Sequence, residues 1–195
     1  MMRTFKRFPL GLALAMGAMA VGAGSLLAAT PPAVDDCEAL PTMDFTSIQD
    51  APTQVTATRM VEAAGEVPAH CRVEGYVAPN VRIVLRLSKD AAWNGKFLEA
   101  SPGGYGGSTE SMVAWCDVAL RRGYACLTHD TGHFGTTRRS SWAYNNLQAE
   151  FDYGIRGHYV AALAGKAIIE HYYGSAPEFS YHLGCSGGGK QGMVE

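Results

Sequence analysis

Near residue 186 the sequence reads Tyr181-His182-Leu183-Gly184-Cys185-Ser186-Gly187-Gly188-Gly189-Lys190-Gln191-Gly192. It contains a Gly-x-Ser-x-Gly pattern directly after a β-prone segment. In a nucleophile elbow, glycines at this spacing permit a sharp strand-to-helix turn that lifts the serine hydroxyl above the sheet. Ser186 is therefore the candidate catalytic nucleophile.

An elbow serine is followed along the chain by an Asp or Glu and then by a His. The few residues between Ser186 and Glu195 do not supply both. We therefore expect residues 30–195 to be the N-terminal portion of an α/β-hydrolase catalytic domain, with the rest of the domain missing. We also expect the 195-residue chain to be inactive by itself.

A serine nucleophile also needs hydrogen-bond donors directed at the developing oxyanion. The first candidate is the backbone N–H of Gly187, directly after the serine. The second is the amide of Gly103 or Gly104, in the glycine-rich loop Ser101–Gly107 between an expected strand and an expected helix. The alternative for this loop is a flexible or phosphate-binding turn. No Gly-Lys-Ser/Thr sequence follows it, which disfavours a nucleotide P-loop.

The residues before the elbow alternate between strand and helix patterns. An expected strand at 81–87 is followed by Asn94-Gly95, which predicts a hairpin turn into an antiparallel strand at 96–100. The remaining patterns, taken in chain order, predict a helix at 111–120, a strand at 124–128, a helix at 155–172 and a strand at 179–183. This order predicts a doubly wound α/β fold with a mostly parallel sheet flanked by helices and ending just after the elbow.

The N-terminus has the pattern of a signal peptide. Arg3, Lys6 and Arg7 precede an uncharged run from Leu10 to Ala29, and Thr30-Pro31-Pro32 begins a polar stretch. We expect residues 1–29 to direct export and the mature protein to be secreted or periplasmic. Leu27 fits the cleavage motif poorly, so an uncleaved membrane anchor is the alternative.

Composition excludes some partners and leaves others open. The 16 Lys and Arg nearly balance the 18 Asp and Glu, and they form no basic patch, so nucleic acid is not an expected partner. After removal of the signal peptide we expect one incomplete domain and no membrane association. The oligomeric state is not predicted.

The chain has five cysteines and no Cys-x-x-Cys spacing, which favours disulfides over a metal site in an exported protein. Because the number is odd, at least one cysteine has no intrachain partner. Cys185, beside the candidate nucleophile, is either a buried apolar residue or half of a disulfide whose partner lies beyond Glu195.

The histidines are weaker candidates for chemistry. His129-Asp130-x-x-His133 could supply metal ligands or displaced triad members, but Thr131-Gly132 makes the segment a loop without a nearby third ligand. We expect a structural role, in which Asp130 accepts backbone hydrogen bonds. No metal site or cofactor site is predicted in this chain. Structural roles are also expected for His158, His171 and His182.

Several longer strings are similar to the tannase and feruloyl esterase family. They are Trp93–Leu98, Gly103–Tyr105, Gly123–Ala125, Thr128–His133, Asp152–Val160, Lys166–Ile169 and Tyr172–Gly192. Together these strings follow the family order from about residue 37 to residue 195. The agreement is much more specific than Gly-x-Ser-x-Gly alone.

The resemblance implies a secreted α/β-hydrolase that cleaves esters of phenolic acids such as ferulate, gallate or mono(2-hydroxyethyl) terephthalate. It also implies a disulfide between Cys185 and a cysteine after the catalytic His, and a lid inserted beyond Ser186 that often holds a structural calcium ion. A family bridge resembles Cys37–Cys71, whereas Cys116–Cys126 is inferred from parity and proximity. The sequence departs from the family at Ser101-Pro102, where further glycines are usual, and at Lys190, where Arg is commoner.

We therefore expect a serine carboxylesterase of the feruloyl esterase or tannase type, with a small phenolic ester as its substrate. A serine peptidase or acyltransferase with the same elbow is one alternative. A catalytically silent fragment is the other.

Overall fold

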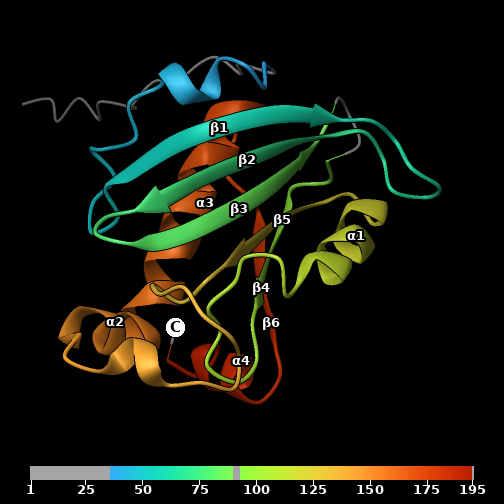
Figure 1. Cartoon of the computed structure of the whole chain (residues 1–195). Coiled ribbons are helices and arrows are strands. Elements are labelled where there is room, and N and C mark those ends of the chain that lie inside the picture. Colours follow the sequence, from blue (N-terminus) through green and yellow to red (C-terminus); the bar gives the residue numbers. More distant parts are fainter. Residues whose placement is uncertain (1–35, 90–92, 195) are drawn as a thin grey trace, which may run out of the picture.

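A twisted six-stranded sheet organises the computed structural model, which describes residues 36–89 and 93–194 (Figure 1). The strand order is β1-β2-β3-β5-β4-β6. The first three strands form an antiparallel ribbon: β1 (Thr53–Val61), β2 (His70–Val77) and β3 (Val81–Ser88). β5 (Tyr124–His129) pairs antiparallel with β3 and joins this ribbon to the parallel part of the sheet.

The parallel part places three strand ends at one edge of the sheet. β4 (Lys96–Ser101) lies between β5 and β6 (Phe179–Gly184) and is parallel to both. Parallel neighbours need crossover connections, and two helices supply them. α1 (Val113–Arg121) connects β4 to β5, and α3 (Gly157–Tyr173) lies between β5 and β6.

Short helices complete the chain. They are the 3-10 turns η1 (Leu40–Thr42) and η3 (Ser141–Ala143), α2 (Leu147–Phe151), the π-helical turn η4 (Asp152–Arg156), and α4 (Gly187–Gln191). η4 runs directly into α3, and α4 begins directly after Ser186. Among the residues that the structure describes, no helix has the length and apolarity needed to cross a bilayer.

α1 and α3 cover opposite faces of the sheet. Two successive residues of β5 show this, since successive side chains along a strand point to opposite faces. Leu127 of β5 packs toward α3, where a Cβ on Gly165 would lie 2.8 Å from its Cδ1. The next residue back, Cys126, forms a disulfide with Cys116 of α1. The larger apolar core lies on the α3 side and the smaller one on the α1 side.

The predicted hairpin at Asn94-Gly95 is wrong. β3 and β4 are not neighbours, because β5 lies between them. Gly95, with φ of +78°, accepts hydrogen bonds from the amides of Glu178 and Phe179, and Asn94 bonds to Gly123 and Arg122. The turn dipeptide thus ties together the starts of β4, β5 and β6 instead of reversing the chain between two partners.

The other predicted elements between residues 81 and 184 are present, with ends that differ by one or two residues. The described sheet is mixed: of its five strand pairings, three are antiparallel and two are parallel. Two of the three antiparallel pairings involve β1 or β2, and the sequence patterns did not predict these two strands. The predicted signal peptide, residues 1–29, lies outside the described residues.

Candidate active site

The chain makes a sharp turn at Ser186, between β6 and α4. Ser186 has φ of +56° and ψ of −116°, in a backbone region that a residue with a Cβ rarely occupies. Glycine is needed on both sides of it, since a Cβ on Gly184 would clash with the backbone of Gly188. A Cβ on Gly188 would lie 2.5 Å from the carbonyl oxygen of Ser101. The elbow therefore packs directly against the end of β4.

The glycine-rich loop after β4 lies against this elbow. In the loop, the amides of Tyr105, Gly106 and Gly107 donate to Thr137 O, Gly103 O and Asp130 O, at 3.0, 3.2 and 2.9 Å. Among the described residues, the amides of Gly103 and Gly104 have no such backbone partner. These are the two amides that the sequence left as alternatives for the second oxyanion donor.

Gly104 is the loop residue nearest to Gly187. A Cβ on Gly187 would meet the carbonyl oxygen of Gly104 and would lie 3.0 Å from its amide nitrogen. The elbow and the loop, which are more than 80 residues apart in sequence, thus approach each other backbone to backbone. Ser186, Gly187 and the Gly103–Gly104 segment are thereby brought together. They lie where β4 and β6 end and α4 begins, and Figure 1 shows α4 at that end of the two strands.

A buried polar cluster lies beneath the loop. His129 Nε2 lies 2.9 Å from Ser101 Oγ and 3.2 Å from Glu99 Oε1, and all three residues are at most 1% exposed. His129 Nδ1 accepts the Thr131 amide at 3.2 Å, so a neutral ring carries its proton on Nε2. This Ser-His-Glu group has the residue types of a triad, but it is sealed from solvent. Its position instead anchors the end of β4 to β5.

Asp130 holds the next turn. Its carboxylate accepts hydrogen bonds from the Arg82 amide at 3.0 Å, Arg82 Nε at 2.6 Å and the Gly132 amide at 2.8 Å. Burial raises the pKa of Asp130, and the hydrogen bonds from Arg82 and Gly132 partly offset this effect. The structural role predicted for Asp130 is confirmed. The described residues contain no cluster of three or more His, Cys, Asp or Glu side chains able to hold a metal ion.

Comparison with known proteins identifies the family. The family model described as tannase and feruloyl esterase matches residues 65–195. The chain belongs to the tannase and feruloyl esterase family. The resemblance seen in the sequence is thereby confirmed, and the matched segment includes both the glycine-rich loop and the elbow.

The curated relatives of this tannase-family chain are enzymes named for ester hydrolysis. One is a mono(2-hydroxyethyl) terephthalate hydrolase of Piscinibacter sakaiensis, 31% identical over 68% of this chain and 25% of that protein. Another is a probable feruloyl esterase B-2 of Aspergillus flavus, 33% identical over 63% of this chain and 23% of that protein. The chain thus spans about a quarter of the length of these relatives.

Two solved structures have a fold similar to that of this chain. A tannin acyl hydrolase from Aspergillus niger matches with a TM-score of 0.63 and 19% identity, over 83% of this chain and 33% of that one. Feruloyl esterase B from Aspergillus oryzae matches with a TM-score of 0.60 and 23% identity, over 80% of this chain and 32% of that one. These matches confirm the expected fold, that of part of an α/β-hydrolase domain.

The described residues of this chain form two disulfides, and these are the two pairs expected from the sequence. Cys37 is joined to Cys71, and Cys116 to Cys126. Cys185 is a free thiol and is exposed beside Ser186, so it is not a buried apolar residue. The first disulfide fixes the N-terminal segment to β2, and the second fixes α1 to β5.

Within residues 36–89 and 93–194, no side chain forms a hydrogen bond to the Ser186 hydroxyl. His182 Nε2 instead lies 2.9 Å from the carbonyl oxygen of Gly188. His158 is buried on α3, and His171 contacts the Phe45 ring edge-on at 5.5 Å. These positions fit the structural roles expected for the three histidines.

An aromatic cluster flanks the loop. The His133 ring stacks on Trp142 with 3.8 Å between centroids, and Tyr105 and Tyr153 contact the same indole at 6.1 and 5.2 Å. Burial, together with the positive charge of Arg82, lowers the pKa of His133 to about 4. The His133 ring is therefore neutral at pH 7, and its environment is that of a packing residue.

Proposed function

We propose that this chain provides the nucleophile and the oxyanion-binding half of a carboxylic ester hydrolase that acts on esters of phenolic or other aromatic acids. The observation that carries the proposal is the strained Ser186 backbone packed against the Gly103–Gly104 loop. Membership of the tannase and feruloyl esterase family and the names of the relatives support the substrate class.

The chemistry that we assign to the site is acyl transfer. Ser186 Oγ attacks the ester carbonyl while a base outside the described residues takes its proton. The carbonyl oxygen gains negative charge and is held by the Gly187 amide and by the Gly104 or Gly103 amide. The carbon–oxygen bond to the alcohol then breaks, the alcohol leaves with a proton, and water hydrolyses the acyl-enzyme to regenerate Ser186.

The test is ester hydrolysis by the protein expressed from its full open reading frame. We expect turnover of ethyl ferulate and of a p-nitrophenyl ester, and a fall of more than about 1000-fold in kcat for Ser186→Ala. A melting temperature close to that of the wild type would show that Ser186→Ala is folded. Hydrolysis that survives in this variant would refute the nucleophile, and a preference for peptide amides would favour a serine peptidase.

We also propose that the protein is exported, with residues 1–29 removed. The two disulfides support this, since such bonds persist in oxidising compartments. N-terminal sequencing of the protein recovered from the culture medium or periplasm should begin at Thr30. Recovery of an intact Met1 in the membrane fraction would contradict cleavage and support the anchor.

A further inference from the structure

A lysine on the elbow helix makes contacts that the proposed chemistry does not use. Lys190 Nζ donates to the carbonyl oxygens of Tyr153 at 2.7 Å and Gly154 at 3.3 Å, and it lies 4.1 Å from the centroid of the Tyr153 ring. Both carbonyls belong to η4, a π-helical turn of the kind that often occurs at functional sites. The elbow helix is therefore tied to the start of α3.

Tyr153 continues this connection to the glycine-rich loop. Its hydroxyl donates to the carbonyl oxygen of Gly104 at 3.1 Å. The amide of Tyr105, in the same peptide group, donates to Thr137 O at 3.0 Å. Because a peptide group is planar, these two bonds fix the orientation of the Gly104–Tyr105 peptide.

The preceding peptide is also held. The carbonyl oxygen of Gly103 accepts the Gly106 amide at 3.2 Å. In a trans peptide the C=O and N–H groups point in opposite directions, so the Gly104 N–H points away from Gly106. With both flanking peptides fixed, the Gly104 amide, whose nitrogen lies close to Gly187, has little freedom to change its direction.

We propose that Tyr153 and Lys190 are positioning residues that hold the Gly104 amide in place as the second oxyanion donor. This inference rests on the proposed function and chooses Gly104 over Gly103. The Lys190–Tyr153–Gly104 connection links three elements that must keep their relative positions: the elbow helix α4, the π-helical turn η4 and the loop after β4. Neither side chain touches the reacting atoms.

The environment of the two side chains suits such a connection. Burial lowers the pKa of Lys190, and burial together with Tyr105 raises the pKa of Tyr153. The Tyr153 hydroxyl is therefore protonated at neutral pH and able to donate. The contact between the lysine cation and the aromatic ring adds an attraction that a neutral side chain at position 190 would lack.

Enzyme kinetics of the protein expressed from the full open reading frame test this proposal. Tyr153→Phe removes one hydroxyl and keeps the ring, so we expect kcat for ethyl ferulate to fall about 10-fold with little change in KM or melting temperature. That is part of the roughly 100- to 1000-fold loss expected when a donor is removed entirely. Lys190→Met should also lower kcat, and Lys190→Arg should restore most of that loss because it keeps the charge and the donors.

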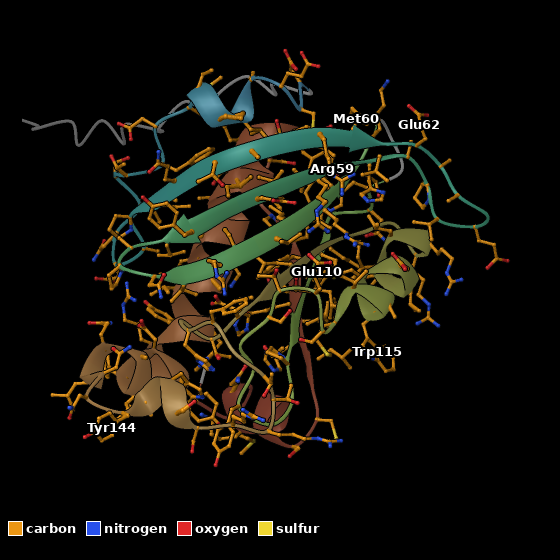
Figure 2. The ribbon with its side chains drawn as sticks, viewed as in Figure 1. Arg59, Met60, Glu62, Glu110, Trp115 and Tyr144 are labelled. Carbon is orange, nitrogen blue, oxygen red and sulfur yellow. A yellow bond between two sulfur atoms is a disulfide. The ribbon has the colours of Figure 1, made fainter. Side chains whose placement is uncertain are left out.

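Tyr144→Phe is the matched control. Tyr144 is 83% exposed, its hydroxyl makes no hydrogen bond to a described residue, and it lies at the outer edge of the molecule beside α2 (Figure 2). This variant should match the wild type. A Tyr153→Phe enzyme with wild-type kcat, in a protein whose activity depends on Ser186, would overturn the proposal.

A second readout does not need activity. In the [15N]glycine-labelled 195-residue chain, the amide signal of Gly104 should shift and exchange faster in Tyr153→Phe than in Tyr144→Phe. An unchanged Gly104 signal would also overturn the proposal. If Ser186→Ala kept its activity, the proposed function would fail by itself, and the Gly104 signal would still decide whether Tyr153 holds this amide. If Lys190→Met did not fold, the two Tyr→Phe variants would be sufficient for the test.

Discussion

His133 is a buried residue whose protonation opposes folding. Its pKa is lowered from 6.5 to about 4, first by burial and then by Arg82. Between these pH values the unfolded chain binds more protons than the folded one, so the free energy of unfolding falls as the pH falls from 6.5 to 4. We expect this residue to contribute on the order of 2 kcal/mol to that loss. Above pH 6.5 its contribution is constant.

Urea denaturation at pH 7, 5.5 and 4 measures this effect. The His133→Gln variant should lose less stability between pH 7 and pH 4 than the wild type, because Gln does not titrate. Some pH dependence will remain in the variant, since burial also lowers the pKa of His70. Equal losses in the two proteins would show that His133 is not protonated on unfolding in this range.

Local sequence patterns predicted those residues of the candidate site whose types are required by the backbone geometry of the turn. Ser186 and its flanking glycines could be identified because an elbow needs these residue types at this spacing. Glu99 and Tyr153 could not. Glu99 meets His129 only through the pairing of β4 with β5, and Tyr153 meets Gly104 only through the packing of η4 on a loop 49 residues away.

At the scale of elements, Gly165 sets how closely α3 approaches the sheet. A Cβ at this position would lie 2.8 Å from Leu127 Cδ1 and 3.1 Å from Phe97 Cζ, and both side chains are fully buried. Gly165→Val should therefore destabilise the protein by about 1–3 kcal/mol, because a close-packed core has no room for the added methyl groups. The measurement is the urea midpoint at constant m.

Lys166→Val is the control for this variant. It places the same β-branched residue one position further along α3, at a partly exposed site. It should lower the free energy of unfolding only by the difference in helix propensity between Lys and Val, which is under about 1 kcal/mol. If the two variants were equally stable, the close contact between α3 and the sheet would not limit stability.

The failed hairpin shows why the order of strands is harder to predict than their existence. Val81–Ser88 and Lys96–Ser101 each have strand character, and Asn-Gly between them is a strong local turn signal. Which strands pair depends on how side chains are buried across the whole sheet. β5 lies between β3 and β4, buried on both faces, with α3 against Leu127 and α1 against Cys126.

At the scale of the whole molecule, the last strand of the described sheet is its least covered. β6 has no buried residue, and Phe179 and Tyr181 are 55% and 43% exposed. Beside it, Leu98, Trp115, Tyr124 and Tyr181 line a largely apolar groove of about 260 Å³. β4, its inner neighbour, is mostly buried. Within the described residues, the edge strand β6 thus has exposed aromatic side chains and an apolar groove beside it.

This arrangement bears on activity, because Ser186, the proposed nucleophile, directly follows β6, and within the described residues no side chain forms a hydrogen bond to its hydroxyl. We expect the purified 195-residue chain to fold, with Gly104 and Ser186 in place, but to hydrolyse p-nitrophenyl acetate no faster than its Ser186→Ala variant. An isolated serine hydroxyl is a weak nucleophile, and oxyanion donors alone leave only a small rate advantage over water. Circular dichroism of both proteins would establish folding. Turnover by the 195-residue chain that disappears in Ser186→Ala would mean that it contains a base for this serine.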